Sequence, residues 1–284
     1  MKNKTILYGL IWLFVLVATA SGVFYQAPGA QIEYLTVRGE NAVFQGSGLY
    51  QYDPMEVARE GVIWDAINLV IGLPLLAIAI YRTGRNLLRG RLLLGGLLFY
   101  FFYVYLQYAT MVAFNPLFLV YVAIFALSAV AFFINLQGMD VSRLPAQVSG
   151  QFPRRLFIGF TFVFGAALIL LWGRLIVSIM ATNQFPANIA GMNTLQTQAL
   201  DLGLVVPLTL STGVLLWRRS AWGYLLAGIT LTFGFMMMIT IQTWIAVPLV
   251  QEGKIDLIEA SPFLILSLVG LYLVGKFYWN VQEE

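Results

Sequence analysis

Two short polar patches interrupt long apolar runs in this chain, and their side chains are of the kinds that bind cations and polar ligands. Asp65 and Asn68 lie three residues apart, as do Gln198 and Asp201. In a helix that spacing places both side chains on one face. A carboxylate at the centre of a bilayer costs about 2.5–3.5 kcal/mol, so it is expected to face other helices or water. These four residues are therefore candidate ligand-binding residues.

Three further polar residues are expected near the same site. Tyr103 and Gln107 share one face of a very aromatic apolar run. Arg174 lies near the far end of another run, at a depth similar to that of Asp65 and Asp201. Opposite charges at one level of a low-dielectric interior attract strongly, so we expect Arg174 to pair with one of these two acids.

Each candidate also has an ordinary structural interpretation, which the sequence leaves open. Buried polar side chains form hydrogen bonds between membrane helices, worth about 0.6 kcal/mol each. Asp201 is close enough to the start of its helix to be an N-terminal cap. Arg174 is placed to extend toward the membrane surface. A face such as that of Tyr103 and Gln107 commonly packs against a neighbouring helix.

The residue types that are missing exclude several classes of chemistry. The chain has no Cys and no His. Disulfides, Cys/His zinc sites, His-ligated haem and Ser-His-Asp catalysis are therefore excluded. No Walker loop, dinucleotide-binding glycine motif or cluster of metal ligands occurs in the sequence. We therefore predict no catalytic residue, no metal site and no cofactor.

The composition predicts the class of protein that must position these residues. The chain has 284 residues, of which 60% are hydrophobic and 10% charged. A soluble protein of this size needs more charged residues on its surface. We therefore expect most of this surface to face the lipid bilayer. The net charge of +3 indicates no nucleic-acid partner, because the basic residues gather at helix ends. We predict an all-α, polytopic membrane helical bundle with eight transmembrane helices, at residues 5–25, 61–81, 92–114, 117–136, 156–179, 198–217, 221–247 and 262–278.

The longest polar stretch, residues 26–60, is predicted to carry a small extracytoplasmic β-hairpin. Two β-prone runs, 32–38 and 42–49, flank a turn at 39–41. The hairpin is interpreted either as a lid over the outer helix ends or as a gate or docking surface. The stretch is acidic, with five acids and two bases: Glu33, Glu40, Asp53, Glu56, Glu60, Arg38 and Arg59.

The distribution of basic residues predicts the orientation. With the N-terminus in the cytoplasm, three basic residues fall outside, Arg38, Arg59 and Lys254, and twelve fall inside. This bias follows the positive-inside rule. We expect a multi-pass protein of the inner (plasma) membrane with both termini cytoplasmic. The twelve are Lys2, Lys4, Arg82, Arg85, Arg89, Arg91, Arg143, Arg154, Arg155, Arg218, Arg219 and Lys276.

The second and sixth spans indicate a parallel internal repeat. When Pro74 is laid over Pro207, Asn68 falls on Asp201 and an arginine-containing turn follows in both. Both spans run in the same direction, so a duplication would relate the halves by an axis along the membrane normal. Apolar helices also resemble one another by chance, so both explanations stay open. The predicted division is a first four-helix half at 1–136, a cytoplasmic linker at 137–155 and a second half at 156–284.

Two stretches resemble segments of bacterial multi-span membrane proteins to which no activity is assigned. One comprises 65–76 and 114–123, and the other 198–207 and 218–224. Together with their surroundings they extend over about half of the chain. The resemblance implies that both stretches belong to one recurring architecture, and it implies no ligand and no catalytic residue.

Three functions fit these observations. The first is binding or transport of a small polar molecule, a cation or a lipid headgroup through an outward-facing polar cavity in the membrane. The second is a non-catalytic accessory subunit with a membrane-protein partner, favoured by the short loops and the lack of catalytic residue types. The third is an intramembrane lipid-modifying enzyme with Asp65 or Asp201 as the base. The sequence offers that enzyme no nucleophile or metal ligand, so it ranks last.

Overall fold

The computed structural model describes residues 2–148, 150–186, 189–252 and 257–283. Within these residues, eight helices are long and apolar enough to cross a membrane, which confirms the predicted helical membrane bundle. Two of the eight spans are broken helices, each interrupted by a short π-helical segment. The helices are α1 (Lys2–Phe24), α2 (Met55–Ile67), α3 (Leu73–Gly84), α4 (Leu88–Thr110), α5 (Phe118–Gln137), α6 (Leu144–Gln147), α7 (Arg154–Thr182), α8 (Gln196–Leu200), α9 (Val206–Trp217), α10 (Ala221–Glu252) and α11 (Leu257–Asn280).

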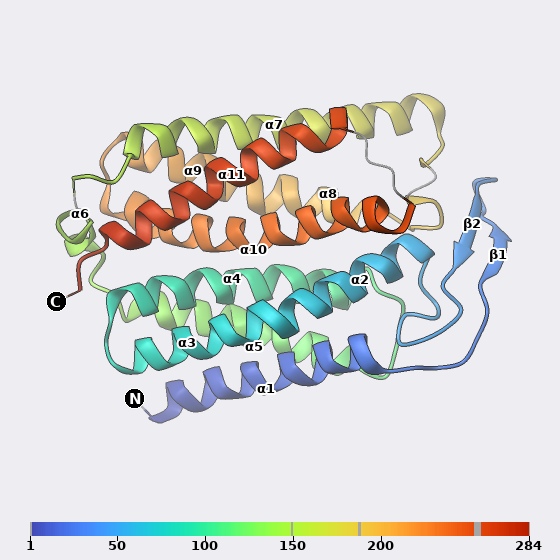
Figure 1. Ribbon diagram of the computed structural model, residues 1–284, viewed down its shortest axis with the longest axis horizontal. Helices are drawn as coiled ribbons and strands as arrows, with labels where there is room; N and C mark the ends of the chain where they lie inside the picture. Colours follow the sequence, from blue (N-terminus) through green and yellow to red (C-terminus); the bar gives the residue numbers. More distant parts are fainter. Residues whose placement is uncertain (1, 149, 187–188, 253–256, 284) are drawn as a thin grey trace.

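The spans form two groups of four that pack side by side (Figure 1). In the first group α1 packs on α2, α3 and α5, and α4 packs on α3 and α5. In the second group α7 and α10 take the corresponding places, since both pack on α9 and on α11. The main contact between the groups is that of α4 with α10. Helix α4 therefore lies at the centre of the molecule.

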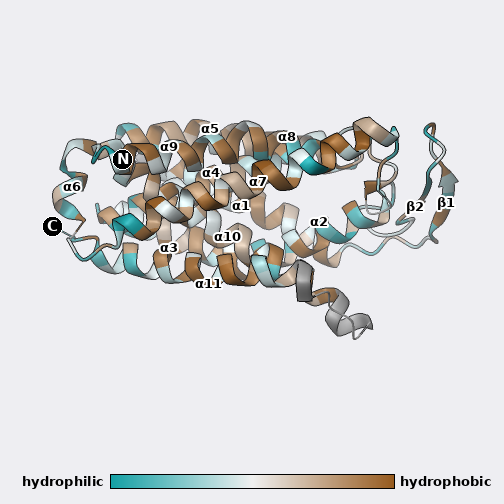
Figure 2. Cartoon of the chain, turned by 90° about the horizontal axis from the view of Figure 1, so that it is seen from above, coloured by the Kyte–Doolittle hydropathy of each residue, from teal (hydrophilic) through white to brown (hydrophobic). Residues whose placement is uncertain are grey.

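The burial of each helix follows from its place in this arrangement. In α4, 72% of the apolar window is buried, against 22% in α7 and in the last span. The exposed residues of the outer helices are mostly large and apolar, as expected of surfaces that face lipid. Hydrophobic residues run along the helices, and hydrophilic residues gather toward their ends (Figure 2).

The two broken spans share one cause. Each contains a π-helical segment, Asn68–Gly72 and Asp201–Val205, that ends just before a proline. Pro74 and Pro207 have no N–H, and a proline ring clashes with the carbonyl four residues earlier. The N–H of the residue before each proline instead bonds the carbonyl five residues back, which is that of Asn68 or Asp201. The predicted polar residues therefore begin the widened turns.

The turns after these spans also correspond. Asn86 and Arg219 occupy matching positions, and both have a left-handed backbone, with φ of 61° and 55°. Gly90 and Gly223 each lie against the backbone of the preceding turn, where a Cβ would come within 3 Å of it. These correspondences support our proposal that the chain consists of two duplicated halves, 1–136 and 156–284, joined by the linker 137–155.

A two-stranded antiparallel hairpin, β1 (Ile32–Leu35) and β2 (Asn41–Phe44), lies beyond one end of the bundle (Figure 1). Its strands are shorter than predicted, because Thr36 to Glu40 form the turn. The hairpin rests on the connection between α7 and α8. There the Arg38 guanidinium lies 4.2 Å from the centre of the Phe185 ring, and Glu40 accepts the Phe185 N–H at 2.7 Å. We call this end of the molecule the hairpin end.

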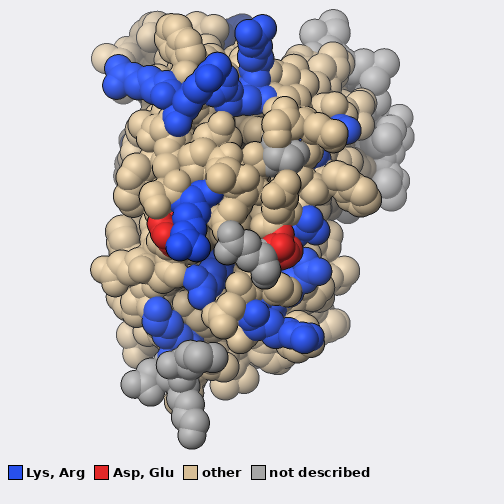
Figure 3. All heavy atoms as spheres, turned by 90° about the vertical axis from the view of Figure 1, so that its left-hand side faces the viewer, with Lys and Arg blue, Asp and Glu red and all other residues tan. Residues whose placement is uncertain are grey.

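Both chain termini lie at the opposite end, which we call the basic end (Figure 1). Lys and Arg side chains dominate its surface, with few acids among them (Figure 3). The C-terminal segment joins the two halves here: Arg89 donates to the Val281 carbonyl at 2.6 Å and lies 3.7 Å from Glu283. The basic residues that we predict to lie on the cytoplasmic side therefore occupy one end of the molecule, as far as their side chains are described. Lys254, predicted outside, lies beyond the described residues.

The absence of cysteine provides a direct test of orientation. Val37 in the hairpin turn and Ala146 in α6 are both exposed, at opposite ends of the molecule. We expect Val37→Cys to react with a membrane-impermeant maleimide on intact cells, and Ala146→Cys to react only after permeabilisation. The reverse pattern would invert the proposed topology. Reaction of both on intact cells would contradict a multi-span arrangement with sealed sides.

Candidate functional site

Asp65 is fully buried in a cage of tyrosine hydroxyls. Tyr50, in the segment before α2, donates a hydrogen bond to Oδ2, and Tyr108 of α4 donates to Oδ1 at 3.2 Å. The Tyr108 hydroxyl also lies 2.9 Å from the Gly61 carbonyl. On the remaining side Gly22 of α1 approaches so closely that any Cβ would overlap Oδ2. These neutral groups satisfy the carboxyl and leave no space beside it.

Asn68 lies one helical turn further along and is also fully buried. Its Oδ1 accepts a hydrogen bond from the Tyr100 hydroxyl of α4 at 2.9 Å. Its Nδ2 has no hydrogen-bond partner among the described residues. Asn68 is therefore a buried polar residue one turn from Asp65, as predicted, but it bonds a different tyrosine of α4 from the one that bonds Asp65.

Asp201 lies where the two halves meet. Its Oδ1 accepts from the Tyr103 hydroxyl of α4 at 2.6 Å, and its Oδ2 accepts from the Trp172 indole of α7 at 2.8 Å. It is 7% exposed, so it is not a solvent-facing helix cap. The partly exposed Glu60 of α2 is within electrostatic range of both Asp201 and Tyr103. The structure thus joins two predicted residues, Asp201 and Tyr103, across the interface.

A line of polar contacts leads from this carboxyl toward the hairpin end. Gln107, one turn along α4 from Tyr103, accepts from the Thr197 hydroxyl at 2.9 Å. The next contact outward joins Gln196 to Thr110. The predicted site residue Gln198 is buried, and its Oε1 has no hydrogen-bond partner in the described part of the chain. The segment around α8 therefore supplies polar groups to α4 at successive depths.

Two expectations about the site need correction. Arg174 is exposed on α7, and no ion pair between described residues includes it. Asp65 and Asp201 are bonded by tyrosine and tryptophan instead, because those rings fill the space that a guanidinium would need. The two acids also lie in separate cages, and Trp64 packs against a tyrosine of each. The centre of the Trp64 ring lies 6.5 Å from that of Tyr103, which bonds Asp201, and 6.3 Å from that of Tyr108, which bonds Asp65.

A cavity of about 380 Å³ does exist, but it lies at the hairpin end, outside the buried acids. We call it the hairpin pocket. Its lining includes Tyr34 and Phe44 of the hairpin, whose rings stack on each other with their centres 4.1 Å apart. The other lining residues come from the start of α2, the end of α4 and the connection before α8. They are Tyr52, Asp53, Pro54, Val57, Thr110, Met111, Ala113, Gly191, Met192, Asn193, Thr194 and Gln196.

Asp53 is the only charged residue among the described residues that line the hairpin pocket. It is 1% exposed, and its Oδ1 accepts the Ala113 N–H at 2.7 Å. Burial raises the pKa of Asp53 to about 6, and the Ala113 hydrogen bond lowers it only in part. The carboxyl is therefore largely ionised at neutral pH, and it gives the pocket a negative potential. A potential of this sign favours a positively charged ligand.

Sequence reasoning missed the residues that complete these sites. Tyr50 and Asp53 lie in the irregular segment between β2 and α2, where no periodicity indicates which side chains turn inward. Tyr108 belongs to the aromatic run of α4, and its five-residue spacing from Tyr103 on the same helix was the available signal. Trp172 gave no signal, because a lone Trp in an apolar span is commonly an interface residue.

The geometry is therefore that of a membrane protein with a pocket at the hairpin end and two closed polar networks. Comparisons of the chain with protein-family models, with curated proteins and with solved structures found no match. Among the described residues no group of three or more acids, histidines or cysteines could hold a metal ion. A functional assignment therefore has to come from the chain's own pockets and contacts.

The close approach of Gly22 to Asp65 is testable by substitution. In Gly22→Ala the new methyl group overlaps Asp65 Oδ2 and lies 2.9 Å from the Tyr50 hydroxyl. Overpacking of this kind costs about 1–3 kcal/mol, so we expect the thermal unfolding midpoint in detergent to fall by several degrees. Gly9→Ala in the same helix is the control, because nothing lies within 4 Å of its Cβ. Equal midpoints for the two variants would contradict the cage.

The raised pKa of Asp53 predicts a pH-dependent stability. The folded protein holds the Asp53 proton more tightly than the unfolded chain, whose pKa is 3.8, so the stability falls as pH rises from about 4 to about 6. The full loss corresponds to about 3 kcal/mol. Asp53→Asn keeps the Oδ1 acceptor and removes the titration. We expect the thermal unfolding midpoint of wild type, relative to that of Asp53→Asn, to fall as pH rises across this window. A difference between the two midpoints that stays constant with pH would refute the assignment.

Proposed function

We propose that this protein is an integral membrane binding protein, of the transporter type, whose hairpin pocket takes a small polar molecule carrying a positive charge. The observation that carries the proposal is the pocket itself, with its aromatic lining residues and with Asp53 as the one charged group among the described residues that line it. Its volume of about 380 Å³ is within the range of small-molecule sites. The proposed orientation places this pocket on the outer face of the inner membrane.

The lining has the features that recognise an organic ammonium group. Aromatic faces attract cations through their negative potential, and Tyr34, Phe44 and Tyr52 supply such rings. Hydroxyl and amide groups of the lining, including those of Asn193 and Gln196, supply neutral hydrogen-bonding groups for the rest of the ligand. An anion is disfavoured here, because Asp53 would repel it.

The hairpin acts as a lid in this proposal. Tyr34 packs so closely on Gly191 that a Cβ there would overlap its hydroxyl. Arg38 donates to the Met192 carbonyl at 3.2 Å. These contacts fasten the hairpin of the first half to a loop of the second, over the pocket. A ligand that enters from the outer side must pass between the hairpin and this loop.

The polar line from Gln196 and Thr110 to Asp201 suggests a transport route. Its groups form three separate hydrogen-bonded pairs at successive depths of the bundle, Gln196 with Thr110, Thr197 with Gln107, and Tyr103 with Asp201. A cation that leaves the pocket along this line reaches a carboxyl at the interface of the two halves. In this version of the proposal Asp201 is the inner binding group, and opening requires α4 and α8 to separate.

Binding can be tested with choline and its uncharged carbon isostere as probes. We expect millimolar choline to raise the thermal unfolding midpoint of the detergent-purified protein at pH 7.5, because a ligand that binds only the folded state stabilises it. The isostere should give a much smaller shift. Asp53→Asn should lose most of the choline shift, whereas Glu33→Gln, on the same hairpin but outside the pocket, should keep it.

The pH dependence gives a further check on the same experiment. Protonation neutralises Asp53 below about pH 6, so the choline shift should shrink there in wild type and be independent of pH in Asp53→Asn. Equal shifts for choline and its isostere would show that charge plays no part. The absence of a shift with either probe at any pH would refute a pocket for small ammonium compounds.

A further inference from the structure

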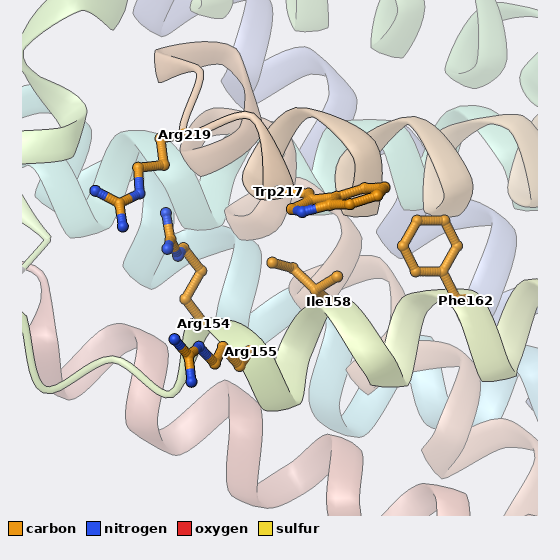
Figure 4. Close-up of a pocket in the computed structure, with 6 residues that line it drawn as sticks. All are labelled: Arg154, Arg155, Ile158, Phe162, Trp217 and Arg219. Carbon is orange, nitrogen blue, oxygen red and sulfur yellow. The ribbon is translucent and has the colours of Figure 1, made fainter.

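A second cavity, of about 560 Å³, lies at the basic end and has no part in the proposed function. It opens between the first turns of α7 and the end of α9, two helices that pack against each other. Figure 4 shows the Arg154 and Arg219 side chains facing one another across its mouth, with Arg155 beside them. Further along α7 the lining becomes apolar. The lining residues are Arg154, Arg155, Ile158, Phe162, Trp217 and Arg219.

The three guanidinium groups gather without an acid to balance them. The ion pairs between described residues join Arg59 to Glu56, Arg89 to Glu283 and Arg143 to Asp140, and include none of the three. Arg154 and Arg155 also occupy the first turn of α7, where the positive end of the helix dipole lies. Like charges placed at a positive helix end repel one another unless an anion lies between them.

Arg219 adopts a backbone conformation that an arginine does not favour. Its φ is 55°, in the left-handed region that glycine and asparagine tolerate best. The corresponding turn of the first half has Asn86 at this position, and there the Asn86 side chain accepts from Arg91 at 3.0 Å. In the second half the residue is an exposed arginine that lines the pocket. An unfavourable conformation that points a charge into a cavity indicates a binding role.

The rest of the lining identifies the ligand class. Ile158 and Phe162 project from α7 toward the Trp217 ring, to the right of the arginines in Figure 4 and further along the helix. All three belong to membrane spans, and the arginines lie at or just beyond the ends of those spans. A free phosphate needs no apolar floor and fills little of about 560 Å³. A phospholipid has both parts, since its phosphate lies at the level of the span ends and its acyl chains extend along the helices.

We propose that this cavity binds the phosphate headgroup of an anionic phospholipid, with the arginines as its ligands and Ile158, Phe162 and Trp217 against the acyl chains. Arginine pairs with phosphate through two parallel N–H donors, which a rigid fork of this kind presents without reorganisation. The proposed orientation places the lipid in the cytoplasmic leaflet, where anionic lipids attract basic segments.

The experiment measures lipid retention by native mass spectrometry of the full chain, with phosphatidylglycerol or phosphatidylcholine added to the detergent. We expect tighter retention of phosphatidylglycerol by wild type. Arg219→Asn, and Arg154→Gln with Arg155→Gln, should weaken it at least tenfold. Arg218→Gln should leave it unchanged, because Arg218 is exposed and adjacent in sequence but does not line the cavity.

A second readout separates binding from folding. Asparagine suits the left-handed turn, so Arg219→Asn without added lipid should unfold at an equal or higher temperature than wild type, while its stabilisation by phosphatidylglycerol falls. Equal retention of the two lipids by wild type, or equal loss in Arg218→Gln, would overturn the proposal. Competition by millimolar inorganic phosphate as effective as that by the lipid would identify a soluble anion as the ligand instead.

Discussion

The interior of this protein depends on one constraint: a carboxyl or amide group inside the bilayer must be satisfied by other protein groups, because no water is present to do so. The described structure meets it for both buried acids mainly with hydroxyl groups from one helix, to which the Tyr50 hydroxyl and the Trp172 indole are added. Tyr108, Tyr103 and Tyr100 of α4 donate to Asp65, Asp201 and Asn68. The residues that these tyrosines bond lie on α2 and on the π-helical segments of both groups of helices, so α4 has to lie between them. Its deep burial follows from this central position.

The prolines place those partners. A helix that loses one N–H inside lipid must compensate locally, and here it widens by one residue per broken span. The widened turns begin at Asn68 and Asp201, so the same irregularity that proline imposes determines where the polar side chains meet α4. The spacing between the polar residue and the proline that follows it therefore determines both the π-helical turn and the position of the polar side chain.

The sequence predicted the spans and the hairpin well, because each depends on local features, namely apolar length and turn residues. It also marked Asp65 and Asp201 as isolated acids in apolar runs, and their role in ligand binding stays a prediction. It could not predict the partners of Asp65, since Tyr50 comes from an irregular segment and Gly22 acts by having no side chain. The expected Arg174 pair was wrong for a similar reason. Depth along a helix can be read from sequence, but the direction in which a helix face points depends on packing between helices.

The two groups of helices have corresponding backbone features but differ in their chemistry, and this difference bears on where the proposed site lies. Laid over α4, helix α10 has Phe233, Met236 and Ile241 where α4 has its three donor tyrosines. The acid Asp65 likewise falls on Gln198, which lacks its charge. Tyrosine donors occupy these three positions on α4 and not on α10, and they bond acids or an amide from both groups of helices. This difference supports the proposed asymmetric site, to which the second group contributes Asp201 and the connection that lines the hairpin pocket.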